Sequence, residues 1–181
     1  MGKIILITGG CRSGKSKFAE QKLASIGDNA TYIATAPALD TEMQARIQKH
    51  RNDRQKRNWQ TIEEQINLAK AIEQANSNVL VDCLTLWLNN LLYKAQSNNI
   101  KFTEDSILEP CQKLIQVMQK SNFTTILVTN EIGLGIVPEN ACTRLFRDCA
   151  GQISQQIAHI ADEVIFVVAG LPLYIKNSNN L

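Results

Sequence analysis

The chain has 181 residues, of which 44% are hydrophobic and 20% charged, which excludes a disordered or fibrous protein. Lysine and arginine number 19 and aspartate and glutamate 17, so the net charge of +2 argues against nucleic acid or an anionic membrane as partner. No apolar stretch is long enough to cross a bilayer, and we expect a cytoplasmic protein. Five cysteines without a Cys-x-x-Cys pair predict free thiols in a reducing compartment.

Short apolar runs rich in isoleucine and valine predict parallel strands that are buried on both faces. These runs are residues 3–8, 31–35, 79–81, 125–129 and 164–169. Segments with helical spacing of apolar residues separate them, at 16–25, 41–50, 61–74, 85–93, 105–119 and 144–160. Irregular structure is expected at 96–99, 133–140 and 177–181. The alternation predicts one α/β domain over residues 1–181, with a mostly parallel sheet flanked by helices.

Residues 9–16 fit the pattern G-x-x-x-x-G-K-[ST] between the first predicted strand and the first predicted helix. There the glycines turn backbone N–H groups toward a phosphate chain, and the helix adds the positive end of its dipole. Lys15 would reach the β- and γ-phosphates, and the Ser16 hydroxyl would bind Mg²⁺. A glycine-rich turn with a chance lysine is the alternative, but the flanking elements favour a nucleotide site. Its predicted residues are Gly9, Gly10, Cys11, Arg12, Ser13, Gly14, Lys15 and Ser16.

Asp82 follows the buried run 79–81 directly. A magnesium–nucleotide site needs a carboxylate at the end of a neighbouring strand, and Asp82 meets that requirement. The same side chain could instead cap the helix that begins near residue 85. We favour the metal role, in which Ser16 and Asp82 hold Mg²⁺.

Arg46, His50 and Arg54 recur every four residues, next to Arg51, so a helix here would carry a cationic stripe. Such a stripe is usually a solvated surface. Arginine also suits triphosphate oxygens, however, and a neutral imidazole is a nucleophile that can attack phosphorus. Periodicity does not separate these two interpretations. The other histidine, His159, is interpreted as an ordinary helix residue.

Several blocks of the chain, taken together, resemble the bifunctional adenosylcobinamide kinase / adenosylcobinamide-phosphate guanylyltransferase family of cobalamin biosynthesis. The blocks are TGGCRSGKS (8–16), YIAT (32–35), DTEMQARIQKHRNDR (40–54), WQTIE (59–63), DCLTLWLNNLL (82–92), VTNEIGLGIVPEN (128–140) and RLFRDCAGQ (144–152). They follow the family's order and cover nearly the whole chain. The blocks around His50 and after residue 128 are more specific than the phosphate loop.

The resemblance implies two reactions. In the first, ATP or GTP phosphorylates the aminopropanol hydroxyl of adenosylcobinamide, and Lys15, Mg²⁺ and the loop amides stabilise the transferring phosphoryl group. In the second, His50 attacks the α-phosphorus of GTP and expels pyrophosphate, leaving a guanylyl-histidine. Adenosylcobinamide phosphate then takes the GMP to form adenosylcobinamide-GDP. His50 and Lys15 are therefore the expected catalytic residues.

The same resemblance implies further GTP-binding residues. They are Ala34, Thr35, Ala36, Arg51, Asn52, Asp53, Arg54, Glu63 and Asp82. A carboxylate such as Glu63 suits guanine, because it accepts hydrogen bonds from the ring N–H and the exocyclic amine. The family also implies a RecA-like P-loop fold assembled as a homotrimer.

The chain departs from the family's pattern at two positions: Cys11 replaces the usual alanine and Gln55 replaces a frequent proline. Glu131, after Asn130 in a matching block, is either a general base for the kinase hydroxyl or a structural acid at a strand end. Two rival functions remain. One is another P-loop small-molecule kinase with His50 on the surface. The other is a nucleotide-dependent binding module, such as a GTP switch or a DNA-binding ATPase, and the net charge of +2 counts against nucleic acid as its partner.

Overall fold

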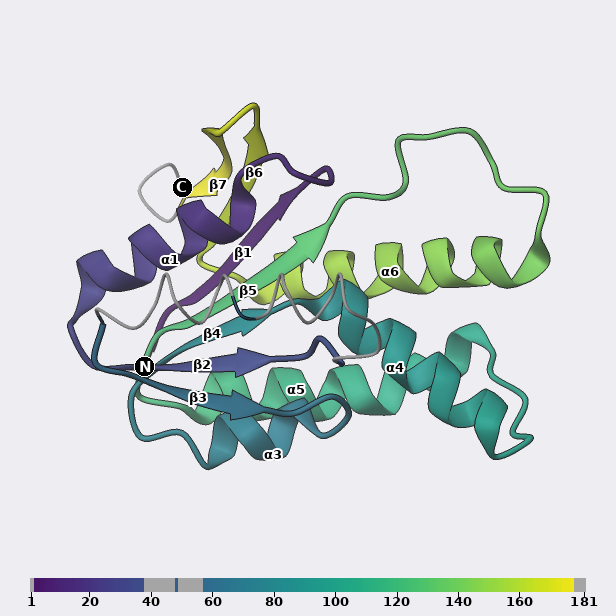
Figure 1. Ribbon diagram of the computed structural model, residues 1–181, viewed down its shortest axis with the longest axis horizontal. Helices are drawn as coiled ribbons and strands as arrows, with labels where there is room; N and C mark the ends of the chain where they lie inside the picture. The colour runs from purple at the N-terminus through teal and green to yellow at the C-terminus, as the bar shows by residue number, and fades with distance from the viewer. Residues whose placement is uncertain (1, 38–47, 49–56, 178–181) are drawn as a thin grey trace.

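A computed structural model describes residues 2–37, 48 and 57–177 of the chain. Its described strands form one sheet in the order β3-β2-β4-β5-β1-β6-β7, in which β7 alone runs antiparallel (Figure 1). The strands are β1 (Ile4–Gly9), β2 (Ala30–Ala34), β3 (Trp59–Glu63), β4 (Asn78–Asp82), β5 (Thr125–Asn130), β6 (Glu163–Val168) and β7 (Leu171–Asn177). The predicted mostly parallel α/β sheet is confirmed.

Helices cover both faces of this sheet. They are α1 (Lys15–Ile26), α3 (Leu68–Glu73), α4 (Leu84–Ser97), α5 (Leu108–Lys120) and α6 (Ala141–Ile160), with a 3₁₀ turn η1 (Glu104–Ile107) before α5. One hydrophobic core joins the sheet to α3, α4, α5 and α6, and a second joins the opposite face to α1. No helix in the described ranges is long and apolar enough to cross a membrane.

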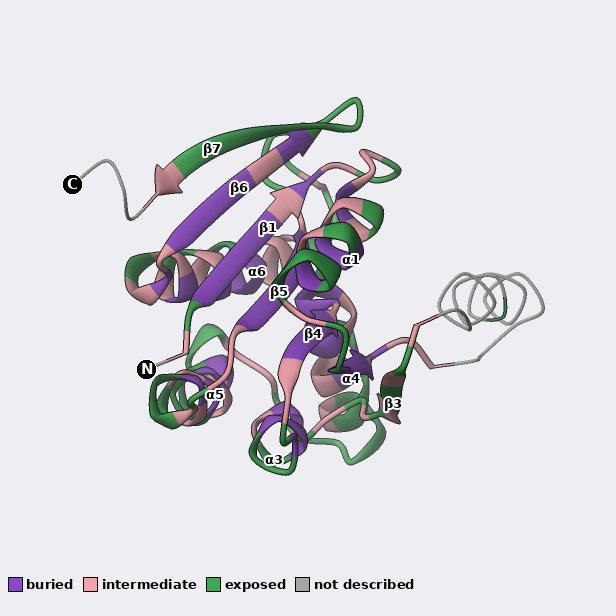
Figure 2. Cartoon of the chain, turned by 90° about the vertical axis from the view of Figure 1, so that its left-hand side faces the viewer, coloured by how far each residue is buried: buried purple, intermediate pink, exposed green. Residues whose placement is uncertain are grey.

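The central strands are buried on both faces, as the end-on view shows (Figure 2). Along β1, Ile4 and Leu6 belong to the larger core, whereas Ile5 and Ile7 belong to the core beneath α1. Because a strand alternates its side chains between faces, both sets must be apolar to be covered. This requirement explains the continuous apolar runs of the sequence.

The helix predicted over residues 61–74 was wrong in its first half. Residues 59–63 form β3, which pairs in parallel with β2 along its whole length. The helix α3 begins only at Leu68, after Glu64 accepts hydrogen bonds at 2.8 Å from the backbone N–H groups of both Ile66 and Asn67. Strand pairing therefore overrode the helical spacing of the apolar residues.

Strand β7 was not predicted. It folds back on β6 through Ala169 and Gly170, which both have positive φ angles, 51° and 81°. Two such residues form the kind of tight hairpin that the twist of paired strands favours. The predicted tail at 177–181 overlaps β7 at Asn177 and otherwise lies outside the described residues, as does the predicted helix 41–50 apart from Gln48.

Candidate active site

The phosphate loop joins the end of β1 to the start of α1. Its backbone turns sharply, with φ angles of 57° at Arg12 and 94° at Gly14, and the Ser13 N–H donates to the carbonyl of Gly10 at 3.2 Å. A side chain at Gly9 would place its Cβ 2.5 Å from the Val167 carbonyl oxygen. Glycine is thus required at Gly9 by close packing and favoured at Gly14 by backbone geometry.

The turn between β6 and β7 supports this loop from the side. The Gly170 N–H donates to the Ser13 carbonyl at 2.8 Å, and a Cβ on Gly14 would lie 3.1 Å from the Gly170 Cα. The Ser13 hydroxyl is buried and has no hydrogen-bond partner among the described residues. A buried hydroxyl without a partner is costly, and in this loop a phosphate oxygen would satisfy it.

Lys15 is 8% exposed, which is unusual for a charged side chain. Its ammonium group donates to the Gly10 carbonyl at 3.2 Å, so the side chain folds back over the phosphate loop. A backbone carbonyl only partly offsets the cost of burying this charge. A phosphate chain held by the loop would supply the missing negative charge.

Ser16 and Asp82 lie together, as their predicted shared role requires. The Ser16 hydroxyl donates to Asp82 Oδ1 at 3.4 Å, and the Tyr32 hydroxyl donates to Asp82 Oδ2 at 3.0 Å. The carboxylate therefore faces α1, and Cys83, the N-cap residue of α4, makes no side-chain capping hydrogen bond. A hydroxyl beside a carboxylate suits Mg²⁺, which takes few protein ligands and adds phosphate oxygens and water. No cluster of three or more acidic, histidine or cysteine ligands occurs in the described ranges.

Thr35 has a structural role that the sequence did not reveal. Its buried hydroxyl donates to the Cys83 carbonyl at 2.8 Å and accepts from the Cys83 N–H at 2.7 Å. The Asn90 side chain also donates to the Thr35 carbonyl at 2.8 Å. Burial, and then the charge of Asp82, raise the pKa of the Cys83 thiol to about 11. These hydrogen bonds join the carboxyl ends of β2 and β4 at Cys83, the residue next to Asp82.

The predicted binding residue Glu63 lies, like Asp82, at the carboxyl edge of the sheet, where the parallel strands end. Ala34 pairs with Glu63 on one side and with Asp82 on the other, so the three residues form a row across β3, β2 and β4. Ala36 follows in the loop after β2 and is half-buried. The sheet thus brings Ala34, Ala36, Glu63 and Asp82 to its carboxyl edge.

The predicted nucleophile and its neighbours, His50, Arg51, Asn52, Asp53 and Arg54, lie outside the described residues, as does Arg46. The chain is described again at Arg57, which donates to the Glu20 carbonyl at 2.8 Å. The Arg57 guanidinium also lies 4.7 Å from the centre of the Trp59 ring, a cation–π contact. Arg57 therefore fixes this point of the chain to α1.

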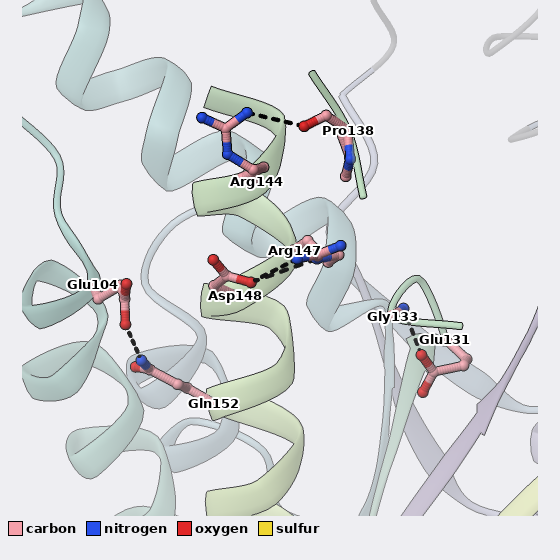
Figure 3. A network of polar contacts seen from close by, with 8 residues as sticks. All are labelled: Glu104, Glu131, Gly133, Pro138, Arg144, Arg147, Asp148 and Gln152. Carbon is pink, nitrogen blue, oxygen red and sulfur yellow. Dashed lines mark hydrogen bonds and ion pairs between the residues drawn. The ribbon is translucent and has the colours of Figure 1, made fainter. Parts of the chain in front are cut away.

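The loop after β5 leaves the same edge and is fixed at both ends (Figure 3). At its start, Glu131 accepts a hydrogen bond at 2.6 Å from the Gly133 N–H. Near its end, Arg144 donates to the carbonyls of Pro138 and Glu139 at 2.9 and 2.6 Å. Glu131 was considered as a general base or as a structural acid, and its hydrogen bond from the Gly133 N–H fits the structural role.

The chain matches the family described as cobinamide kinase / cobinamide phosphate guanyltransferase over residues 5–175. Two relatives are each 42% identical: the bifunctional adenosylcobalamin biosynthesis proteins CobU of Escherichia coli (strain K12) and CobP of Pseudomonas aeruginosa. The first match covers 96% of this chain and 99% of the relative, and the second 94% and 96%.

Among solved structures, the RadB recombinase superposes with a TM-score of 0.50 over 91% of this chain and 74% of its own, at 14% identity. This likeness concerns the fold alone and confirms the predicted RecA-like class. Together with the phosphate loop and the Ser16–Asp82 pair, the match along nearly the whole sequence establishes that the chain belongs to the cobinamide kinase / cobinamide phosphate guanyltransferase family.

Proposed function

We propose that this protein phosphorylates adenosylcobinamide with ATP or GTP and then transfers GMP from GTP to the product, forming adenosylcobinamide-GDP. The observation that carries the proposal is the Ser16–Asp82 pair beside a closed phosphate loop, in a chain of this family. The relatives are named as bifunctional proteins of adenosylcobalamin biosynthesis, which supports assigning both activities to one chain. By the same resemblance we propose that it works as a homotrimer.

In the kinase reaction, Lys15 and the N–H groups of the phosphate loop bind the β- and γ-phosphates. The acceptor hydroxyl oxygen bonds to the γ-phosphorus while the bond from that phosphorus to the leaving diphosphate breaks. Ser16 and Asp82 are the residues that would hold Mg²⁺, which neutralises charge on the phosphates when bound. The reaction needs little covalent chemistry from the protein, so placement and electrostatics account for its catalysis.

In the guanylyl transfer, the His50 imidazole bonds to the α-phosphorus of GTP, and the bond to pyrophosphate breaks. A phosphate oxygen of adenosylcobinamide phosphate then attacks the same phosphorus and releases the imidazole. We assign GTP binding to the residues that match the family: Ala34, Thr35, Ala36, Arg51, Asn52, Asp53, Arg54, Glu63 and Asp82. β2 ends at the carboxyl edge of the sheet, and the sequence that carries His50 comes after it in the chain, which supports its use with the phosphate loop.

The test is covalent labelling by GTP that carries its label on the α-phosphate. After denaturation, we expect protein-bound label that is lost in acid and stable in base, as a phosphoramidate should be. His50→Ala should abolish the label and retain the kinase activity. His159→Ala is the matched control, because it removes the other histidine of the chain, and it should label normally.

Absence of covalent label in the wild-type protein would contradict the guanylyl-histidine. If adenosylcobinamide is still phosphorylated in that case, the protein is a P-loop small-molecule kinase in which His50 has no catalytic role. A GTP turnover that needs a protein partner and no corrinoid would instead favour a nucleotide-dependent switch.

A further inference from the structure

Asn130 is the last residue of β5, and no residue of this strand has a role in the proposed function. In the sheet, β5 lies between β1, which leads into the phosphate loop, and β4, which ends in Asp82. Asn130 pairs with Gly9 on one side, and two residues earlier Val128 pairs with Asp82 on the other. Asn130 therefore projects beyond Asp82 at the carboxyl edge, between the two parts of the phosphate site.

The alternation of side chains along β5 decides which face Asn130 occupies. Ile126 and Val128 belong to the core beneath α1, whereas the hydroxyl of Thr129 lies 3.2 Å from that of Thr85 in α4. Since successive residues of a strand point to opposite faces, Asn130 shares the face of Val128. This is the face of α1, on which Asp82 contacts Ser16.

The backbone at Asn130 is held on both sides. Its N–H donates to the Thr85 hydroxyl at 2.7 Å, and the next N–H, that of Glu131, donates to the Gly9 carbonyl at 3.0 Å. In contrast, the half-buried side-chain amide of Asn130 has no hydrogen-bond partner among the described residues. Two polar groups thus lack partners at this site, the half-buried Asn130 amide beside the phosphate loop and the buried Ser13 hydroxyl within it.

We propose that the Asn130 side chain binds the terminal phosphate of the nucleoside triphosphate and places the acceptor hydroxyl for the kinase reaction. An amide does both, because its NH₂ group donates to a γ-phosphate oxygen while its carbonyl oxygen accepts from the hydroxyl. The acceptor oxygen then bonds to the γ-phosphorus, the bond to the leaving diphosphate breaks, and the hydroxyl proton passes to an oxygen of the transferred phosphoryl group. The inference rests on the proposed kinase activity.

Asn130 is expected to contribute differently to the two proposed activities of the protein. Guanylyl transfer breaks the bond at the α-phosphorus, so it does not need a residue that orients an acceptor at the γ-phosphorus. Glu131, the adjacent acid, is engaged by the Gly133 N–H, whereas the amide of Asn130 is available to a ligand. Asn130 is therefore expected to matter for the phosphorylation of adenosylcobinamide and to matter little for the labelling of His50 at saturating GTP.

The decisive measurement is the affinity for GTP relative to GDP, obtained by titration in Mg²⁺ without any corrinoid. A hydrogen bond to a charged group contributes about 1.5–3 kcal/mol, so Asn130→Ala should weaken GTP binding by about 10- to 150-fold and leave GDP binding unchanged. Asn130→Asp keeps the shape of the side chain and places a negative charge against the γ-phosphate, so it should weaken GTP binding further. Asn122→Ala, an exposed amide before the opposite end of β5, is the control.

In the kinase assay at saturating GTP, Asn130→Ala should lower kcat, while covalent labelling at His50 persists. An unchanged ratio of GTP to GDP affinity in both Asn130→Ala and Asn130→Asp overturns the inference. The affinity ratio does not depend on the acceptor, so this outcome is distinct from failure of the proposed function, which would appear as wild-type protein that does not phosphorylate adenosylcobinamide.

Discussion

The parallel strands begin at one side of the sheet, the amino edge, and end at the other, the carboxyl edge. The polar groups at these two edges are arranged differently. At the amino edge, side-chain oxygens accept from backbone N–H groups: Asp162 accepts from the Ile4 N–H at 2.7 Å, and Asn78 accepts from the Thr124 N–H at 2.9 Å, although the buried Thr125 hydroxyl has no hydrogen-bond partner among the described residues. An ion pair of 2.7 Å between Lys22 and Glu163 also joins α1 to β6 there. At the carboxyl edge, by contrast, the Ser13 hydroxyl and the Asn130 amide, which have no partners among the described residues, share the edge with the buried ammonium group of Lys15.

This difference follows from the direction of the chain. Parallel strands begin with unpaired N–H groups at one edge, and nearby carboxylate and amide oxygens can accept from them. The other edge leads into loops and into the N-terminus of α1, where N–H groups and the Lys15 ammonium accumulate. The amino edge thus supplies acceptors to its own N–H groups, whereas the carboxyl edge gathers donors that a bound anion would satisfy.

The strongest test of this contrast is to remove one lysine from each edge. Lys15→Met should lower the kinase kcat by about a thousandfold, because it deletes a charge that stabilises the transferring phosphoryl group. Lys22→Met should leave the kcat unchanged, because it breaks an ion pair at the amino edge. Steady-state kinetics with adenosylcobinamide checks both variants, and equal losses would contradict the division of roles.

Asp82→Asn is expected to have the next largest effect. It keeps a hydrogen-bond acceptor for Tyr32 while removing the negative charge beside Ser16. We expect the kinase kcat to fall by about a hundredfold and the Mg²⁺ concentration for half-maximal rate to rise, because the charge holds the metal. A Mg²⁺ titration measures both quantities. Tyr32→Phe removes only the neighbouring hydroxyl and should leave the Mg²⁺ requirement unaltered.

Gly14→Ala tests the backbone of the phosphate loop. The φ angle of 94° and the approach of 3.1 Å to the Gly170 Cα both oppose a Cβ. We expect the free energy of unfolding to fall by about 1–2 kcal/mol, with weaker nucleotide binding. Gly10→Ala is a control for the unfolding measurement, since a Cβ there meets no atom within 4 Å. Equal stability losses in both variants would show that loop geometry is not the cause.

Lys22→Met has a second, smaller consequence, this time for stability. The ammonium group pairs with Glu163 and lies 5.6 Å from the centre of the Tyr174 ring. Because the pair is partly screened by solvent, its loss should cost about 1 kcal/mol in chemical denaturation. Lys113→Met breaks the fully exposed pair with Glu109 and serves as the matched control, with a smaller expected change.

The smallest effect concerns the cysteines and their response to pH. Burial raises the pKa values of Cys83, Cys111 and Cys149 to about 11, so at pH 8 only about one thiol in a thousand is ionised. At that pH, alkylation by iodoacetamide should be confined to the exposed thiols of Cys11 and Cys142. Labelling of the buried thiols should increase as the pH rises toward 11. Mass spectrometry locates the label, and GTP should protect Cys11 alone.

Much of the candidate site could be predicted because its parts are local in sequence. The phosphate loop is a single run of eight residues, and Asp82 is the residue that ends an apolar strand. The partners of these residues could not be predicted. Tyr32 and Gly170, which contact Asp82 and Ser13, show no local signal, because their roles exist only after distant strands pair.

The sequence alone determined the class of sheet, the position of the phosphate loop and the family. These properties depend on the order of apolar runs and on short motifs, which are read without knowledge of distant contacts. The tertiary structure decided that residues 59–63 form a strand, that Thr35 bonds to the backbone of Cys83, and that Asn130 pairs with Gly9 at the end of β1. Each of these outcomes depends on which strands become neighbours, and strand order is a property of the folded sheet.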